Sequence, residues 1–204
     1  MSTKKVVPPD WAFEFHGHRC PFMPIGYRMG KLALAYLGVE REKDHTLFVF
    51  PEAGIGHPQI CFIDGIQAAT GATYGKSLVD RTFYGKLAAV FFHVHYLEKG
   101  AVRYALKADF MDAMGKFEFF SYRKRGVEPS QIPQTVADEV INWVYEQNDD
   151  FMFNVKPIYD YKFTPPQGSF SKSKCSLCGE YVFDRYVRTI DGKPVCIPCS
   201  GYDK

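Results

Sequence analysis

Residues 15–38, FHGHRCPFMPIGYRMGKLALAYLG, carry the pattern that decides the fold of this 204-residue chain. In the second part of this stretch, apolar side chains recur every three or four residues, which predicts a helix over 21–38. Gly38 suits the position just past a helix end, where a left-handed backbone is favoured. A similar pattern in PQICFIDGIQAATG predicts a second helix over 58–71, with Gly71 as its C-terminal cap.

Four strands and two further helices are predicted around these two helices. The segments 87–97 and 101–109 are rich in β-branched and aromatic side chains and are separated by a short turn at 98–100, which predicts a hairpin. Because hairpin strands are mixed with helices, the sequence predicts an α+β core over residues 1–160. The remaining predicted elements are strands at 45–53 and 151–159 and helices at 109–123 and 133–147.

The overall composition is that of an ordinary globular protein. Hydrophobic residues make up 46% of the chain, charged residues 24%, and the formal net charge is +2, which argues against disorder and requires neither a nucleic acid nor a membrane as partner. The N-terminus lacks the apolar run of a signal peptide, so a cytoplasmic protein is expected. In a reducing compartment, six cysteines favour metal ligands or reactive thiols over disulfides.

The tail contains two C-x2-C pairs, Cys175 with Cys178 and Cys196 with Cys199, which are separated by seventeen residues. Each pair can bend around one ion, so this spacing predicts a structural zinc site with four thiolate ligands. The alternative is a redox pair of thiols or a set of unrelated surface cysteines.

The residues around these cysteines support a small separate module over 175–204. Asp191-Gly192 predicts the turn of a hairpin between the two pairs. So short a module cannot bury enough apolar surface to fold alone, and a metal ion would supply the missing stability. The preceding segment, 161–174, is rich in Pro, Gly, Ser and Lys and is predicted to be a linker.

A second group of potential metal ligands lies near the N-terminus. His16, His18 and Cys20 fall within five residues at the start of the first predicted helix, and Cys61 lies on the second helix. If the N-termini of the two helices face each other, these side chains could share zinc or another transition metal. Three protein ligands would leave an open, reactive position, whereas four would make a structural site. The alternative is a small buried cysteine beside a histidine that caps a helix.

Other polar residues are weaker candidates for a place at the predicted core site. His57 precedes the second predicted helix, and His93 and His95 share one face of a strand, where surface or packing roles are expected. Asp64 and Gln67 are three residues apart on the second helix and share a face with Cys61, which suits either a partner of a metal ligand or a polar helix surface.

The passage around Lys76 is rich in glycine but lacks the spacing of a phosphate-binding P-loop. Lys76 and Lys86 would still suit an anionic ligand such as a pterin phosphate, the alternative being that they are solvated loop lysines.

Three blocks in this order, residues 15–38, CFIDGIQAATGATYGKSLVD (61–80) and YGKLA (84–88), resemble the E-subunit family of formylmethanofuran dehydrogenase over roughly residues 10–110. The resemblance implies an α+β core with a metal-binding cleft, an appended treble-clef-like zinc finger, and a homodimer intertwined through the core. It also implies a context of molybdenum- or tungsten-dependent formylmethanofuran chemistry. The residues at motif positions are His16, His18, Cys20, Cys61, Asp64, Gln67, Thr70, Gly75 and Lys76.

The sequence departs from the family pattern at two positions. Phe22 stands where the pattern usually has Gly, and Ala72 stands where it often has Cys. The second change removes a thiolate from the neighbourhood of the predicted core site, which favours water or histidine at any open position.

The leading hypothesis is a metal-binding accessory protein that handles a ligand or cofactor, including a pterin-type ligand, at its His/Cys core site. A zinc-dependent hydrolase or transferase is one alternative, and it depends on an open coordination position that activates water. A nucleic-acid- or protein-binding module that acts through the zinc finger is another, and it predicts a contiguous basic face. The basic residues available for that face are Lys172, Lys174, Arg185, Arg188 and Lys193.

Overall fold

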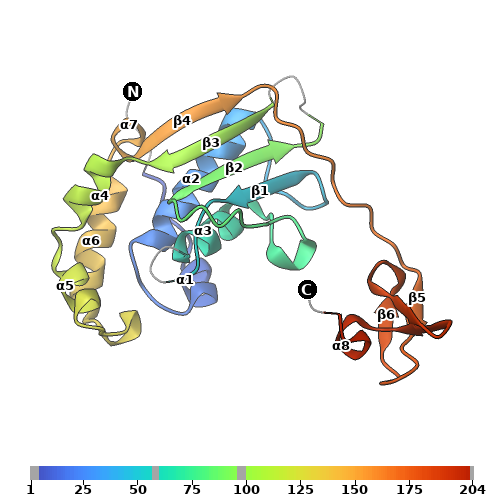
Figure 1. Ribbon diagram of the computed structural model, residues 1–204. Helices are drawn as coiled ribbons and strands as arrows, with labels where there is room; N and C mark the ends of the chain where they lie inside the picture. The colour runs from blue at the N-terminus through green and yellow to red at the C-terminus, as the bar shows by residue number, and fades with distance from the viewer. Residues whose placement is uncertain (1–4, 57–59, 96–99, 203–204) are drawn as a thin grey trace. The chain divides into compact units, whose positions relative to one another are not determined.

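The computed structural model describes residues 5–56, 60–95 and 100–202, and their contacts divide the chain into two units, 1–161 and 162–204. The first unit contains a four-stranded antiparallel sheet in the order β1-β2-β3-β4, with α2 and α3 along one face (Figure 1). With these helices and hairpin strands, the fold is α+β, as predicted. The predicted turn at 98–100 lies largely outside the described residues. The strands are β1 (Leu47–Pro51), β2 (Ala88–His93), β3 (Ala101–Leu106) and β4 (Phe153–Ile158).

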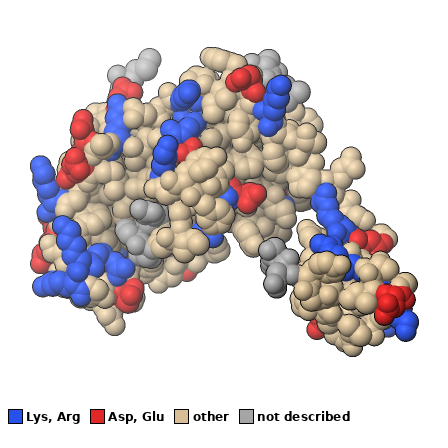
Figure 2. All heavy atoms as spheres, viewed as in Figure 1, with Lys and Arg blue, Asp and Glu red and all other residues tan. Residues whose placement is uncertain are grey.

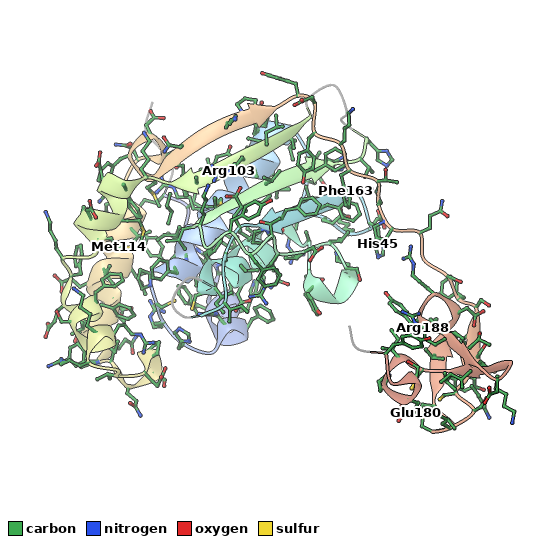
Figure 3. All side chains as sticks on the ribbon, viewed as in Figure 1. His45, Arg103, Met114, Phe163, Glu180 and Arg188 are labelled. Atoms are coloured by element: carbon green, nitrogen blue, oxygen red, sulfur yellow. The ribbon has the colours of Figure 1, made fainter. Side chains whose placement is uncertain are left out.

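The central strand β2 is buried along its whole length, because both faces of the sheet are covered there. The helices lie along one face. The ring of Tyr161 also packs on the sheet, with its centroid 5.9 Å from that of Phe50 and 5.6 Å from that of Phe92. Next to β2, the Arg103 side chain on β3 makes two hydrogen bonds of 2.6 and 2.7 Å to the carboxylate of Glu52, and Figure 3 shows Arg103 in the middle of the sheet.

The two helices predicted first, α2 (Phe22–Leu37) and α3 (Cys61–Thr70), pack with their backbones in contact. A Cβ added to Gly26 would lie 1.8 Å from the carbonyl oxygen of Phe62, so only glycine permits this approach. Gly30 lies against Ala69 in the same way, which means that the two helices run in the same direction. Their N-termini therefore lie at the same end of the molecule, where Cys20 and Cys61 meet.

The helices of the first unit differ from the sequence-based expectation at several points. A short helix that was not predicted, α1 (Asp10–His16), ends at Gly17, whose left-handed backbone closes the helix with a 2.8 Å hydrogen bond to Phe13. Its seven residues are too few for a helical repeat to emerge from the sequence. The helix predicted over 109–123 is divided into α4 (Ala108–Met114) and α5 (Glu118–Lys124). The division lets the Phe117 ring pack on Trp143, with centroids 5.3 Å apart.

A second group of helices completes the first unit at one end of the sheet, where Figure 1 shows α4, α5 and α6 together. The predicted helix 133–147 is α6 (Gln134–Glu146), and α7 (Asp149–Met152) forms the start of the segment that was predicted to be entirely strand. The buried Arg28 on α2 donates a 2.6 Å hydrogen bond to Asp149, which ties this group to α2.

The second unit, 162–204, is a small module with two hairpins. The predicted Asp191-Gly192 turn joins β7 to β8, and both residues have positive φ, at 48° and 74°. The last three residues of the predicted linker, Lys172–Lys174, form a strand that pairs with a second strand. The elements are β5 (Lys172–Lys174), β6 (Tyr181–Phe183), β7 (Arg188–Ile190), β8 (Lys193–Val195) and α8 (Ile197–Ser200).

Short 3-10 helices complete the assignment of the described residues. Among the described residues, the longest helix has 16 residues, and no helix has the length and apolar character needed to cross a membrane. The 3-10 helices are η1 (Tyr74–Lys76), η3 (Pro129–Gln131) and η4 (Asp184–Tyr186).

Candidate metal centres and the adjoining cavity

The structure brings the four predicted residues of the core site together. We call His16, His18, Cys20 and Cys61 the core cluster; each offers one donor atom, and these four atoms all lie within 4.8 Å of one another. His16 comes from the last residue of α1, and Cys61 is the first residue of α3. The parallel packing of α2 and α3 is what brings Cys20 and Cys61 to the same point.

The spacing of the donor atoms fits a tetrahedral ion. Zinc–nitrogen bonds of about 2.0 Å and zinc–sulfur bonds of about 2.3 Å place neighbouring donors roughly 3.3 to 3.8 Å apart in a tetrahedron. The two His Nε2 atoms are 3.2 Å apart, Cys20 Sγ lies 3.6 Å from His16 Nε2, and Cys61 Sγ lies 3.9 Å from His18 Nε2. The residues present therefore fit a bound zinc ion, or a transition metal with similar preferences.

The electrostatics of the core cluster favour a cation. Burial opposes the charged imidazolium of His16, yet its hydrogen bonds to Asp64 and Cys61 outweigh burial and raise its pKa to about 9. Burial likewise opposes the Cys20 thiolate, but the Cys61 thiol and the backbone N–H groups of Phe22 and Met23 lower the Cys20 pKa. The Cys20 sulfur and burial raise the pKa of Cys61 to about 12. A divalent cation would stabilise both sulfurs as thiolates.

A carboxylate and an amide hold His16 in place. Asp64 Oδ2 accepts a 2.8 Å hydrogen bond from His16 Nδ1, and Gln67 Nε2 donates to Asp64 Oδ1 at 3.2 Å. With Nδ1 donating to Asp64, Nε2 of His16 faces the other donors of the core cluster, and a metal ion that displaces the Nε2 proton would bind there. Partners of this kind fix the ring orientation of metal-binding histidines.

The core cluster opens onto a cavity of about 590 Å³, which we call the core cavity. Cys20 lies behind the wall and is 1% exposed, so the metal site would be reached from the side of the histidines and Cys61. The wall is formed by His16, His18, Ile60, Cys61, Ile63, Asp64, Gln67, Tyr74, Val79, Asp80, Arg81 and Phe83.

Of the four predicted ligand-binding residues, Asp64 and Gln67 line the core cavity, whereas Thr70 and Lys76 do not. The Thr70 hydroxyl is fully buried and donates to the Ile66 carbonyl at 2.7 Å. Lys76 Nζ lies 3.4 Å from the carbonyl oxygen of Glu42. The structure thus gives Thr70 and Lys76 local structural contacts, and their ligand-binding role stays a prediction.

Two of the remaining histidine candidates, His93 and His95, are not part of the core cluster. His93 and His95 line a separate cavity of about 380 Å³ together with Glu42. His57 lies outside the described residues.

The four cysteines of the tail form a second group, which we call the finger cluster. The sulfurs of Cys175, Cys178, Cys196 and Cys199 all lie within 4.8 Å of one another. The backbone N–H groups of Cys178 and Cys196 point at the Cys175 sulfur and lower the Cys175 pKa to about 6. Hydrogen bonds with the neighbouring sulfurs raise the Cys199 pKa to about 12, and the hydrogen bond with Cys196 has the largest effect. This arrangement suits a four-thiolate metal site in a small zinc finger.

Comparison with protein families finds a family model that matches most of the first unit. The family model FmdE, described as molybdenum formylmethanofuran dehydrogenase operon, matches residues 15–154, which is well over half of the chain and includes the whole core cluster. The chain belongs to the FmdE family. The finger cluster lies outside the matched residues of this FmdE chain.

Two known proteins are similar to this FmdE chain. A solved structure of a tungsten formylmethanofuran dehydrogenase FmdE-like protein from Syntrophus aciditrophicus has a TM-score of 0.54 and 18% identity, covering 93% of this chain and 88% of that one, and it shows a shared fold. A protein of Archaeoglobus fulgidus named "Probable S-adenosyl-L-methionine-binding protein" is 27% identical over 205 residues. The alignment covers 93% of this chain and 51% of that protein, so the chain spans about half the length of this relative.

Several residues of the core cavity in this FmdE chain were not predicted as site residues, among them Tyr74, Asp80, Arg81 and Phe83. These four lie in the segment between α3 and β2, which has no periodic pattern. Two of them carry signals: Tyr74 is 80% exposed, and Phe83 has a positive φ of 56° that is rare for a bulky residue. Neither signal can be obtained from the sequence without the folded backbone.

Proposed function

We propose that this FmdE-family chain is a metal-binding accessory protein that holds zinc, or another transition metal, at the core cluster and binds a small ligand in the core cavity. The observation that carries the proposal is the tetrahedral spacing of two imidazoles and two thiols at the wall of that cavity. The finger cluster would hold a second zinc ion with a structural role.

Each residue of the core has a distinct part in this proposal. The buried Cys20 and the Asp64-anchored His16 would hold the metal firmly, while His18 and Cys61 would present it to the core cavity. When bound, such an ion supplies Lewis-acid character. Four protein donors at this spacing would fill the coordination sphere of the ion, which favours ligand handling over the alternative of a zinc-dependent hydrolase or transferase.

Metal content per chain tests the proposal. We expect two metal ions per wild-type chain by elemental analysis, one in Cys20→Ser, one in Cys178→Ser as the matched control in the finger cluster, and none in the double variant. One ion in both the wild type and Cys20→Ser would show that the core cluster holds no metal and would reject the proposal.

S-adenosyl-L-methionine binding is a second candidate, suggested by the name of the Archaeoglobus relative. The core cavity would suit such a ligand, because the exposed rings of Tyr74 and Phe83 offer stacking surfaces and the carboxylate of Asp80 offers a partner for a cationic sulfonium or ammonium group. Equilibrium dialysis with labelled S-adenosyl-L-methionine is expected to show retention that Phe83→Ala weakens. No retention by the wild type would reject S-adenosyl-L-methionine binding by this chain.

The alternative of a nucleic-acid-binding finger receives less support. It requires a contiguous basic face on the second unit, whereas the face of this unit in Figure 2 carries both Lys or Arg and Asp or Glu side chains. The carboxylate of Asp184 also accepts hydrogen bonds from Ser171 and Ser173 beside the basic Lys172. A partner protein for the finger stays a proposal.

We also propose a homodimer in the cytoplasm, on the basis of the family resemblance. Light scattering at micromolar concentration is expected to give twice the chain mass of 23.3 kDa. A mass equal to that of one chain would reject the dimer.

A further inference from the structure

A continuous series of hydrogen bonds runs from the core cluster to the rim of the core cavity. His16 Nδ1 donates to Asp64 Oδ2 at 2.8 Å, and Gln67 Nε2 donates to the other oxygen of Asp64 at 3.2 Å. At the far end, Gln67 Oε1 accepts the backbone N–H of Tyr74 at 2.8 Å. Gln67 therefore stands between a metal-ligand partner and a backbone group of the cavity wall.

The backbone N–H of Tyr74, at the far end of this series, fixes the direction of every hydrogen bond in it. The backbone N–H of Tyr74 can only donate, so the carbonyl oxygen of the Gln67 amide must face it. The amide nitrogen then points at Asp64, which must accept from both neighbours because an ionised carboxylate has no proton to donate. This leaves Nδ1 of His16 protonated and Nε2 available as a metal donor.

The rim segment that Gln67 contacts, residues 73–77, has a shape that needs support. It contains η1, whose Tyr74 side chain is 80% exposed and lines the core cavity. It ends at Ser77, a non-glycine residue with a φ of 58°, which the surroundings must hold in place. The hydrogen bond to Gln67 joins the start of this segment directly to α3.

We propose that Gln67 is a positioning residue that couples metal binding at the core cluster to the conformation of the rim segment 73–77. The inference rests on the proposed function, because it requires a metal on Nε2 of His16. A metal there holds the imidazole still, and the fixed Asp64 and Gln67 side chains then hold the Tyr74 N–H. By linkage, a ligand that packs against Tyr74 strengthens metal binding by the same factor.

Hydrogen exchange of the Tyr74 amide measures the coupling at its far end. The full chain is stripped of metal and titrated with zinc chloride, and the Tyr74 exchange rate and the zinc affinity of the core cluster are followed together. We expect zinc to slow exchange at Tyr74 in the wild type. In Gln67→Met, which keeps the side-chain length but removes both hydrogen bonds, we expect fast exchange with or without zinc and a zinc affinity reduced by about 10–100-fold.

Two further variants separate positioning from general destabilisation. Gln67→Glu keeps an acceptor for the Tyr74 N–H but places a carboxylate against Asp64, so slow exchange should persist while zinc affinity falls. Gln131→Met, at an exposed residue of η3, should match the wild type in both measurements.

Two results would overturn the inference while leaving the proposed function intact: zinc binding to the core cluster without a change in Tyr74 exchange, or wild-type zinc affinity in Gln67→Met. A wild-type chain that takes up a single zinc ion, at the finger cluster, would overturn both.

Discussion

Among single residues, Asp64 shapes the core cluster without being one of its donors. Its carboxylate accepts the Nδ1–H of His16 and so aims Nε2 at Cys20 and His18. The side chain is about one-third exposed, so it also faces the core cavity. Carboxylate partners of this type orient a histidine and increase its basicity as a ligand.

Asp64→Asn should therefore weaken metal binding at the core cluster by about 10–100-fold, because an amide supports the imidazole less well. Asp80→Asn is the matched control, since Asp80 lines the same core cavity but lies outside the core cluster. Competition with a chromophoric chelator measures both affinities. Equal affinities in the two variants would contradict the role of Asp64.

Glu42 is a buried carboxylate with a structural role at the start of the sheet. Burial disfavours its charged form, but hydrogen bonds from the Thr46 hydroxyl and from the backbone N–H groups of Leu47, Thr46 and Asp44 outweigh burial and lower its pKa. A carboxyl with a lowered pKa in the folded state adds stability that is present above its ordinary pKa of 4.5 and is lost as the pH falls through the folded pKa.

Glu42→Gln should lower the stability of the first unit by about 1–3 kcal/mol at pH 7, because backbone donors lose a charged acceptor. The difference from the wild type should shrink as the pH falls below 4.5, where the wild-type carboxyl also becomes neutral. Thermal unfolding between pH 3 and pH 7 measures this difference. The Glu42 charge also favours protonation of the nearby His93, so the decisive range lies below pH 4.5, and a difference that grows there as the pH falls would contradict the assignment.

Among the elements, the contact between α2 and α3 positions the core cluster. Gly26 and Gly65 let the two backbones touch, since a Cβ on Gly65 would lie 2.0 Å from the carbonyl oxygen of Met23. A side chain at either position would push the helices apart, and Cys20 would separate from Cys61.

Gly26→Ala should destabilise the first unit by about 3 kcal/mol or more and should abolish metal binding at the core cluster. Gly75→Ala, where an added Cβ meets no atom within 4 Å, is the control and should leave both properties unchanged. Chemical denaturation and elemental analysis provide the two measurements. Unchanged metal content in Gly26→Ala would show that the close helix contact is not what assembles the core cluster.

The elements with a strong repeat could be predicted from the sequence. The predicted helices 21–38 and 58–71 correspond to α2 and α3, because apolar periodicity and terminal glycines act locally. The short α1 could not be predicted because its seven residues are too few for a repeat to emerge, and the division between α4 and α5 depends on packing of Phe117 against the distant Trp143.

The candidate site shows the same division between local and distant information. The donors of the core cluster were predicted, because histidine and cysteine close together favour metal binding whatever the surrounding fold. Tyr74 and Phe83 enter the core cavity through turns whose course is set by tertiary contacts, such as the hydrogen bond of the Tyr74 N–H to Gln67. No repeat in the sequence encodes such contacts.

In the whole molecule, the two units differ in what stabilises them. The first unit has a large apolar core that includes Phe91, Phe110 and Ile66, whereas the second exposes many of its aromatic side chains, Tyr181 and Tyr186 among them. We therefore expect the second unit to depend on a metal ion at the finger cluster for its stability.

Chelation should consequently unfold the second unit first. Limited proteolysis after treatment with a strong chelator should cleave within residues 162–204 while the first unit persists, and Cys178→Ser should show the same cleavage without chelator. Readdition of zinc should protect the wild type and leave Cys178→Ser sensitive. Resistance of the metal-free second unit would contradict its dependence on metal.

The central claim is that this FmdE-family chain carries two metal sites with different donors. X-ray absorption at the zinc edge of the zinc-loaded chain tests it most directly. Since the finger cluster has four sulfur donors and the core cluster has two sulfurs and two nitrogens, the predicted average per zinc is three sulfurs at about 2.3 Å and one nitrogen at about 2.0 Å. Cys20→Ser should shift the average to four sulfurs on a single zinc. Four sulfurs per zinc in the wild type would contradict the account.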